Sequence, residues 1–176
     1  VTHETGFALF QSEVNPYSLK ALKWRDGKAD ILKDFVDACR KHDIKPGVYL
    51  GIRWNSFFGV RDFKVDGTGE MQKYYNAMVE GMLKEVCTKY GDLFEIWFDG
   101  GASSPEKGAP DVLPIVKKYQ PNCLFYHNNQ LAEARWGGSE SGTVGYPCWS
   151  TFTYPSTGNG ESTYKEISEN KNALLK

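Results

Sequence analysis

Asp99 is the strongest candidate in this chain for a residue that takes part in a chemical reaction. It follows an apolar and aromatic run from Phe94 to Phe98 and precedes Gly100 and Gly101. Such a run, bounded by turn residues, predicts a buried strand of a parallel sheet. Parallel sheets carry their active sites at the carboxyl ends of their strands, where this carboxylate would lie. Asp also initiates turns, so the run alone leaves a purely structural role open.

The segments that would position Asp99 alternate between helix and strand signals. Apolar residues at three- and four-residue spacing predict helices over 30–40, 70–88 and 111–119. Extended apolar segments predict strands over 46–51, 94–98 and 123–126. Each predicted strand ends in a polar or glycine-rich loop, and a long aromatic loop is expected over 53–69. These loops would meet at one edge of a parallel sheet.

Two of the predicted helices carry an apolar stripe, which predicts their buried faces. Over 30–40 the stripe consists of Ile31, Leu32, Phe35, Val36 and Cys39. Over 70–88 it consists of Met71, Tyr74, Tyr75, Met78, Val79, Met82, Leu83, Val86 and Cys87. The methionines in the second stripe indicate core packing rather than a cofactor site.

Successive helix-then-strand units predict parallel strands joined by right-handed crossovers. Polar loops at successive strand ends favour an α/β fold of the (β/α)8 TIM-like barrel type, with a flavodoxin-like doubly wound sheet as the alternative. A complete barrel takes about 250 residues. Residues 1–176 are therefore interpreted as a fragment of a single catalytic barrel domain, that is, a partial barrel.

Composition and charge argue against several classes of binding partner. The formal net charge is −1 at pH 7 and basic runs are lacking, which argues against nucleic acid and anionic membranes as partners. The four cysteines show no metal-ligand spacing, and His42 and His127 lie far apart without a cysteine cluster. We therefore expect no metal and no cofactor. The aromatic content of 14% suits both a packed core and a site that stacks on sugars.

Residues 135–160 are rich in glycine, Ser, Thr and aromatic side chains but have no sustained period. Long loops inside a compact domain are usually functional or disordered, and disordered segments are poor in aromatic residues. We interpret this segment as an ordered loop over a site.

Several motifs in order along the chain together resemble one enzyme family. They are Thr2-His3-Glu4-Thr5-Gly6-Phe7, the run from Tyr17 to Arg40, Lys45 to Leu50, Trp97-Phe98-Asp99-Gly100, and Arg135-Trp136-Gly137-Gly138-Ser139-Glu140 with Trp149-Ser150-Thr151. This set resembles glycoside hydrolase family 29, the retaining α-L-fucosidases, and its last motif resembles the α-1,3/1,4-fucosidase branch. Thr2 and Glu4 stand where the family has His and Asp, which leaves open a related L-sugar as substrate.

The resemblance implies a retaining exo-glycosidase that removes terminal α-L-fucosyl residues from oligosaccharides or glycoconjugates by double displacement. Retention needs two carboxyl groups about 5 Å apart. We expect His3 and Arg135 to donate to sugar hydroxyls or to the nucleophile, and Trp54 to stack on the sugar or on the group beyond it. The family motifs imply Asp99 as the nucleophile and Glu140 as the acid/base. They are also compatible with a secreted, periplasmic or lysosomal protein.

Three alternatives stay open at this point. One is an α-L-galactosidase of the same family, and a second is a non-catalytic sugar-binding member. The third is a different barrel hydrolase or lyase that uses Asp99.

Overall fold

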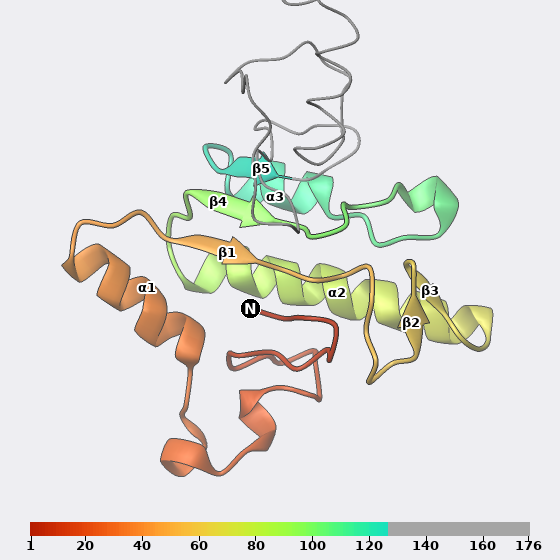
Figure 1. Cartoon of the computed structure of the whole chain (residues 1–176), viewed down its shortest axis with the longest axis horizontal. Coiled ribbons are helices and arrows are strands. Elements are labelled where there is room, and N and C mark those ends of the chain that lie inside the picture. The colour runs from red at the N-terminus through yellow and green to blue at the C-terminus, as the bar shows by residue number, and fades with distance from the viewer. Residues whose placement is uncertain (127–176) are drawn as a thin grey trace, which may run out of the picture.

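The computed structural model describes residues 1–126, drawn as the coloured ribbon in Figure 1. The helical elements are η1 (Leu19–Ala21), η2 (Trp24–Gly27), α1 (Ile31–Lys41), α2 (Gly69–Lys89), η3 (Pro105–Lys107) and α3 (Leu113–Tyr119). The strands are β1 (Gly47–Tyr49), β2 (Val60–Arg61), β3 (Lys64–Val65), β4 (Glu95–Trp97) and β5 (Leu124–Tyr126). The loop expected over 135–160 lies outside the described residues.

The main sheet is parallel and has the order β1-β4-β5. Its register places Val48 of β1 opposite Ile96 of β4, and Ile96 opposite Phe125 of β5. A parallel bridge between Thr2 and Leu50 adds the N-terminal segment on the far side of β1. The α/β class with a parallel sheet is thus confirmed. Chain order equals spatial order here, which favours a barrel over a doubly wound sheet with its reversal, and closure of the barrel stays a prediction.

The two longer helices begin at side chains that cap them. Asp30 accepts a hydrogen bond from the backbone N–H of Lys33 at 2.8 Å, and Thr68 accepts one from that of Met71 at 3.4 Å. Such caps satisfy amide groups that the first helical turn leaves without partners. Both helices begin within one residue of the predicted starts.

The core lies between the sheet and α2, which runs alongside β1 and β4 in Figure 1. Val48, Ile96 and Phe125, the three residues in register across the sheet, are all buried. Most of the predicted stripe of α2 packs in the same core, and Cys39 and Cys87 are buried as predicted.

Parts of the predicted apolar faces are exposed. In α1 the buried residues are Leu32, Val36 and Cys39, whereas Ile31 and Phe35 are 36% and 46% exposed. The stripe was therefore drawn too wide, because Ile31 and Phe35 lie one residue, about 100°, round the helix from its buried centre.

The same correction applies to α2 and to the strand before Asp99. Met71 and Tyr74, in the first turns of α2, are exposed. Phe94 is exposed as well, and the ammonium of Lys45 lies over its ring at 5.0 Å. The strand itself covers only Glu95–Trp97 rather than the predicted 94–98.

The predicted loop over 53–69 contains an antiparallel hairpin, β2–β3, that was not predicted from the sequence. Its two-residue turn is Asp62-Phe63, and both residues have positive φ, 49° and 68°. Hairpin turns of this kind are normally signalled by Asn-Gly or Asp-Gly. A phenylalanine in the second position gives no such signal, which explains the omission.

Candidate active site

Asp99 lies at the carboxyl end of its strand, as the sequence predicts, two residues beyond the last residue of β4. Phe98 before it is fully buried, and the backbone N–H of Gly101 donates to the carbonyl of Phe98 at 3.0 Å. Gly100 has a φ of +71°, which fits the third position of a type II turn. Asp99 therefore both occupies a strand end and begins a turn. The turn keeps its side chain exposed at the carboxyl edge of the sheet.

Tyr49 is the closest described partner of this carboxylate. It is the last residue of β1, in register with Trp97 of β4, and its hydroxyl donates a hydrogen bond of 2.7 Å to Oδ2 of Asp99. Burial raises the pKa of the Tyr49 phenol well above its ordinary value. The hydrogen bond to Asp99, the charge of Asp99 and the charge of Glu4 raise that pKa further. The phenol therefore stays a proton donor to Asp99 throughout the neutral range.

Tyr49 is not among the site residues predicted from the sequence. The signal that could have found it is its place near the end of the strand predicted over 46–51, which precedes β4. Adjacent parallel strands put their carboxyl ends side by side, so strand-end residues of one neighbour the strand-end residues of the next.

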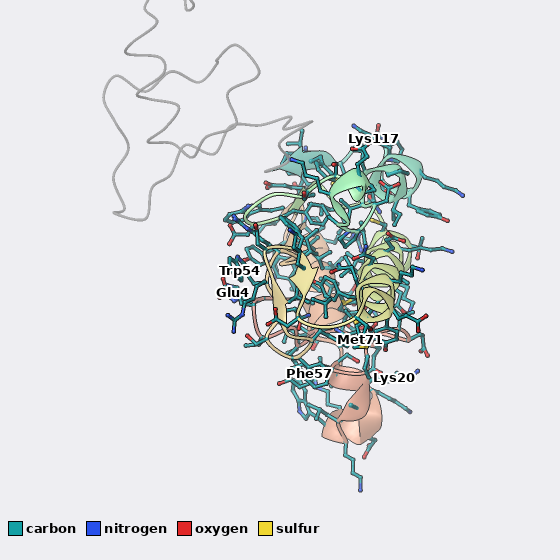
Figure 2. All side chains as sticks on the ribbon, turned by 90° about the vertical axis from the view of Figure 1, so that its right-hand side faces the viewer. Glu4, Lys20, Trp54, Phe57, Met71 and Lys117 are labelled. Carbon is teal, nitrogen blue, oxygen red and sulfur yellow. The ribbon has the colours of Figure 1, made fainter. Side chains whose placement is uncertain are left out.

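Asp99 and Tyr49 line a cavity of about 180 Å³ with five other residues: Glu4, Gly51, Arg53, Trp54 and Gly100. Pockets for drug-sized ligands hold roughly 300–1,000 Å³. The part of this cavity formed by residues 1–126 therefore suits a smaller ligand, such as one sugar ring. Figure 2 looks onto this edge of the molecule, where the labelled Glu4 and Trp54 lie together.

The N-terminal segment brings His3 to this edge. The backbone N–H of Gly51 donates to the carbonyl of Thr2 at 3.1 Å, which fixes the segment beside β1. His3 then stacks on Tyr49, with ring centroids 5.6 Å apart and 13° between the planes. The structure thus places His3 against the tyrosine that contacts Asp99.

Among the remaining predicted site residues, the structure brings Trp54 into the cavity, and its side chain is 40% exposed. Glu140 and Arg135 lie outside the described residues, so their roles stay predictions. Within residues 1–126, His, Cys, Asp and Glu side chains nowhere form a group of three or more that could hold a metal ion. In the same residues, none of the helices combines the length and apolar character needed to cross a membrane.

Comparison with known proteins decides the family. A family model described as α-L-fucosidase matches residues 1–169 of the 176. The chain belongs to the α-L-fucosidase family. Alpha-L-fucosidase 1 of Arabidopsis thaliana is 29% identical over 170 residues, which are 93% of this chain and 32% of the plant protein. The resemblance drawn from the motifs is thus confirmed at the level of the family, whereas the branch within it stays a prediction.

Solved structures agree with this assignment. A Bacteroides thetaiotaomicron protein assigned to the α-L-fucosidases is 62% identical, with a TM-score of 0.81 over 88% of this chain and 37% of that one. The α-L-fucosidase AlfC of Lactobacillus casei, solved with its α-L-fucose product, shares the fold at 21% identity and a TM-score of 0.55, over 70% of this chain and 43% of that one. AlfC thus binds α-L-fucose. The chain spans about a third of the length of the first relatives it matches.

Proposed function

We propose that the protein containing this chain is a retaining exo-α-L-fucosidase and that residues 1–176 form part of its catalytic barrel. The observation that carries the proposal is the geometry of Asp99. In a member of the α-L-fucosidase family, this carboxylate stands at a strand end, lines a cavity and accepts a hydrogen bond from Tyr49.

In the first step Asp99 attacks the anomeric carbon of the bound sugar. The bond from that carbon to the leaving oxygen breaks, and Glu140 donates the proton that the leaving oxygen needs. The product of this step is a glycosyl ester on Asp99. Water then attacks the same carbon, Glu140 takes a proton from this water, and the ester bond to Asp99 breaks. The sugar is released with its original configuration.

Tyr49 contributes to the first step by holding the nucleophile. Its neutral phenol donates to Oδ2, which stabilises the charged carboxylate and limits rotation of the side chain. Stacking on His3 and edge contact with Trp97, at a centroid distance of 5.2 Å, fix the ring that carries this hydroxyl. A nucleophile supported in this way meets the sugar in one orientation.

Glu4 supports a second candidate substrate, an α-L-galactoside. L-Galactose is L-fucose with one more hydroxyl, on C6. Glu4 lines the cavity, and its carboxylate reaches one methylene further than the Asp of the family motif would. Thr2, the other departure from the motif, is buried, and its hydroxyl donates to the carbonyl of Gly51 at 3.2 Å. Thr2 therefore has a structural role here, and Glu4 is the departure that faces a ligand. The Arg135–Glu140 motif favours the α-1,3/1,4-linked branch for the natural linkage.

The test is an assay of the protein containing this chain, expressed in full, on 4-nitrophenyl α-L-fucoside and 4-nitrophenyl α-L-galactoside. We expect hydrolysis of the fucoside, with α-L-fucose as the first product in the NMR spectrum. Asp99→Gly should lose this activity and recover part of it in azide. Faster cleavage of the galactoside would favour α-L-galactosidase activity over α-L-fucosidase activity.

Two other outcomes would overturn the proposal. Release of β-L-fucose first would exclude retention. A wild-type protein that cleaves neither substrate, combined with an Asp99→Ala variant that still binds L-fucose, would support the non-catalytic sugar-binding interpretation instead.

A further inference from the structure

Arg53 brings the only positive side-chain charge to the described lining of the cavity, beside the carboxyl groups of Glu4 and Asp99. Its side chain is 38% exposed. Trp54, which follows it, is also exposed, and we call the solvent-facing part of the lining that these two residues contribute the rim of the cavity. A cation at this rim is placed to contact whatever part of a substrate projects from the cavity.

Three contacts hold Arg53 in this position, two through its guanidinium and one through its backbone. Its Nε donates to Oδ1 of Asp62 at 2.8 Å, and its central carbon lies 5.7 Å from the ring centroid of Trp54. The backbone carbonyl of Arg53 also accepts a hydrogen bond of 2.9 Å from the N–H of Phe63. Side chain and backbone of Arg53 are thus both tied to the turn of the β2–β3 hairpin.

The stem of Arg53 passes close over the turn that follows Asp99. A Cβ added to Gly100 would lie 2.7 Å from Cδ of Arg53, closer than side chains approach in folded proteins. Gly100 is therefore needed at this point for two reasons, its positive φ and the closeness of Arg53. The arrangement brings the guanidinium to the same edge as the carboxylate of Asp99.

The hairpin that carries Asp62 is itself held in a costly conformation. Asp62 and Phe63 both have positive φ, which L-residues other than glycine rarely adopt. Gln72 of α2 anchors the hairpin, because it accepts from the N–H of Val65 at 2.8 Å and donates to the carbonyl of Phe63 at 3.0 Å. The chain thus maintains a strained turn that presents one carboxylate to Arg53.

We infer that Arg53 determines specificity by binding the leaving-group sugar of the substrate, and that Asp62 positions it. The inference rests on the proposed fucosidase activity, in which the terminal sugar occupies the cavity and the leaving group lies at the rim. With Nε engaged by Asp62, the Nη1 and Nη2 groups of Arg53 make no hydrogen bond within residues 1–126. They are donors suited to the hydroxyl oxygens of a sugar.

The charge around the cavity selects the class of leaving group. Glu4 and Asp99 line it, and Asp62 already compensates the charge of Arg53. Among the residues of the lining that the structure describes, a sulfate or carboxylate on the leaving group would meet a net negative surround. The leaving group is therefore an uncharged sugar, whose polar hydroxyls meet Arg53 and whose apolar face can pack on Trp54.

The experiment compares two substrates that differ in this leaving group. α-L-Fucosyl fluoride leaves the rim empty, whereas a neutral fucosylated oligosaccharide fills it. For Arg53→Gln we expect kcat/KM on the oligosaccharide to fall about tenfold, chiefly through KM, since hydrogen bonds to charged groups have about this effect. The value on the fluoride should fall several-fold less, because this substrate offers Arg53 no leaving-group sugar to bind.

Asp62→Asn removes the charge that holds Arg53. It should also lower kcat/KM on the oligosaccharide more than on the fluoride, but by a smaller factor than Arg53→Gln. Matched controls exist on the same hairpin, where Arg61 and Asp66 form an exposed ion pair of 3.7 Å outside the cavity lining. Arg61→Gln and Asp66→Asn should leave kcat/KM unchanged on both substrates. If Arg53→Gln melts below these controls, Arg53→Lys replaces it in the comparison and should show a weaker form of the same KM effect.

Equal losses on the two substrates, or an unchanged oligosaccharide KM, would overturn the inference. If the wild-type protein cleaves neither substrate, the proposed function fails, and calorimetric binding decides the role of Arg53 separately. Weaker binding of the oligosaccharide to Arg53→Gln, with unchanged binding of L-fucose, supports the inference. Equal affinities of the two proteins for the oligosaccharide contradict it.

Discussion

The hydroxyl of Tyr49 donates a 2.7 Å hydrogen bond to Oδ2 of Asp99, and this contact joins the carboxyl ends of two neighbouring parallel strands, β1 and β4. The two residues are 50 apart in sequence. Register across the sheet is what brings them together. The carboxylate at the end of β4 is thereby held by a hydrogen bond from the neighbouring strand.

Tyr49→Phe tests the value of this contact. The change removes the donor but keeps the ring that stacks on His3. A hydrogen bond to a charged group contributes about 1.5–3 kcal/mol, so we expect kcat/KM on an α-L-fucoside to fall roughly 10- to 100-fold. The measurement is steady-state kinetics at neutral pH. An unchanged kcat/KM with unchanged stability would show that Asp99 needs no such support.

Gly100→Ala tests the close approach of Arg53 to the turn after Asp99. The new Cβ would meet both a positive φ and the Cδ of Arg53, whereas Gly108→Ala meets only a positive φ with nothing within 4 Å. Positive φ in an alanine costs about 1–2 kcal/mol. We expect Gly108→Ala to lose that much stability in urea unfolding, Gly100→Ala to lose at least as much, and Gly100→Ala alone to lose activity. Equal activity in the two variants would contradict the packing described here.

Glu85 supports a prediction about stability. Its carboxylate is buried and accepts from the hydroxyl of Ser12 at 2.7 Å, the N–H of Glu13 at 2.8 Å and the ammonium of Lys89 at 2.9 Å. Loss of a buried charged acceptor strands its donors, so Glu85→Ala should lower the free energy of unfolding by about 2–3 kcal/mol. Lys89→Ala should cost about 1 kcal/mol or less, since that side chain is partly exposed. Chemical denaturation measures both, and a smaller loss for Glu85→Ala than for Lys89→Ala would show that the buried donors do not depend on this carboxylate.

Alkaline pH should destabilise the protein through its buried tyrosines. Burial raises the pKa of Tyr75, whose hydroxyl donates to the carbonyl of Ile52 at 2.8 Å, and burial with the nearby Asp30 raises that of Tyr90. A raised pKa means that the folded state keeps protons that the unfolded state loses above about pH 10. The stability that these two tyrosines contribute is therefore fully present below that pH and is lost as the pH rises beyond it.

The check is urea unfolding between pH 8 and the highest pH the protein tolerates. Tyr75→Phe should flatten the decline above about pH 10, where an unfolded tyrosine ionises. The exposed Tyr74 offers the matched control, Tyr74→Phe. A decline equally steep in Tyr75→Phe and in the wild type would contradict the assignment.

The position of Asp99 could be predicted because it depends on local features, an apolar run and two glycines. The helices could be predicted for the same reason, since Asp30 and Thr68 are caps followed by periodic apolar residues. Local patterns also indicated the parallel sheet.

The contacts around Asp99 could not be predicted in this way. Whether Tyr49 faces Asp99 depends on strand register, and a shift of one residue would turn it to the other side. The Asp62-Phe63 turn has no local signal for positive φ, since its stability comes from Gln72 and Arg53 elsewhere in the chain. The exposure of Phe35 was missed because the width of a buried stripe is set by the surface it packs against.

The most direct test of the account is to identify the carboxylate that the substrate labels. The protein expressed in full is treated with 2-deoxy-2-fluoro-α-L-fucosyl fluoride, digested and analysed by tandem mass spectrometry. We predict one fluorofucosyl group, on Asp99, and none in Asp99→Asn. A label on Glu4, the other described carboxylate of the cavity, or a wild-type protein that remains unlabelled while it hydrolyses fucosides, would contradict the assignment of Asp99 as the nucleophile.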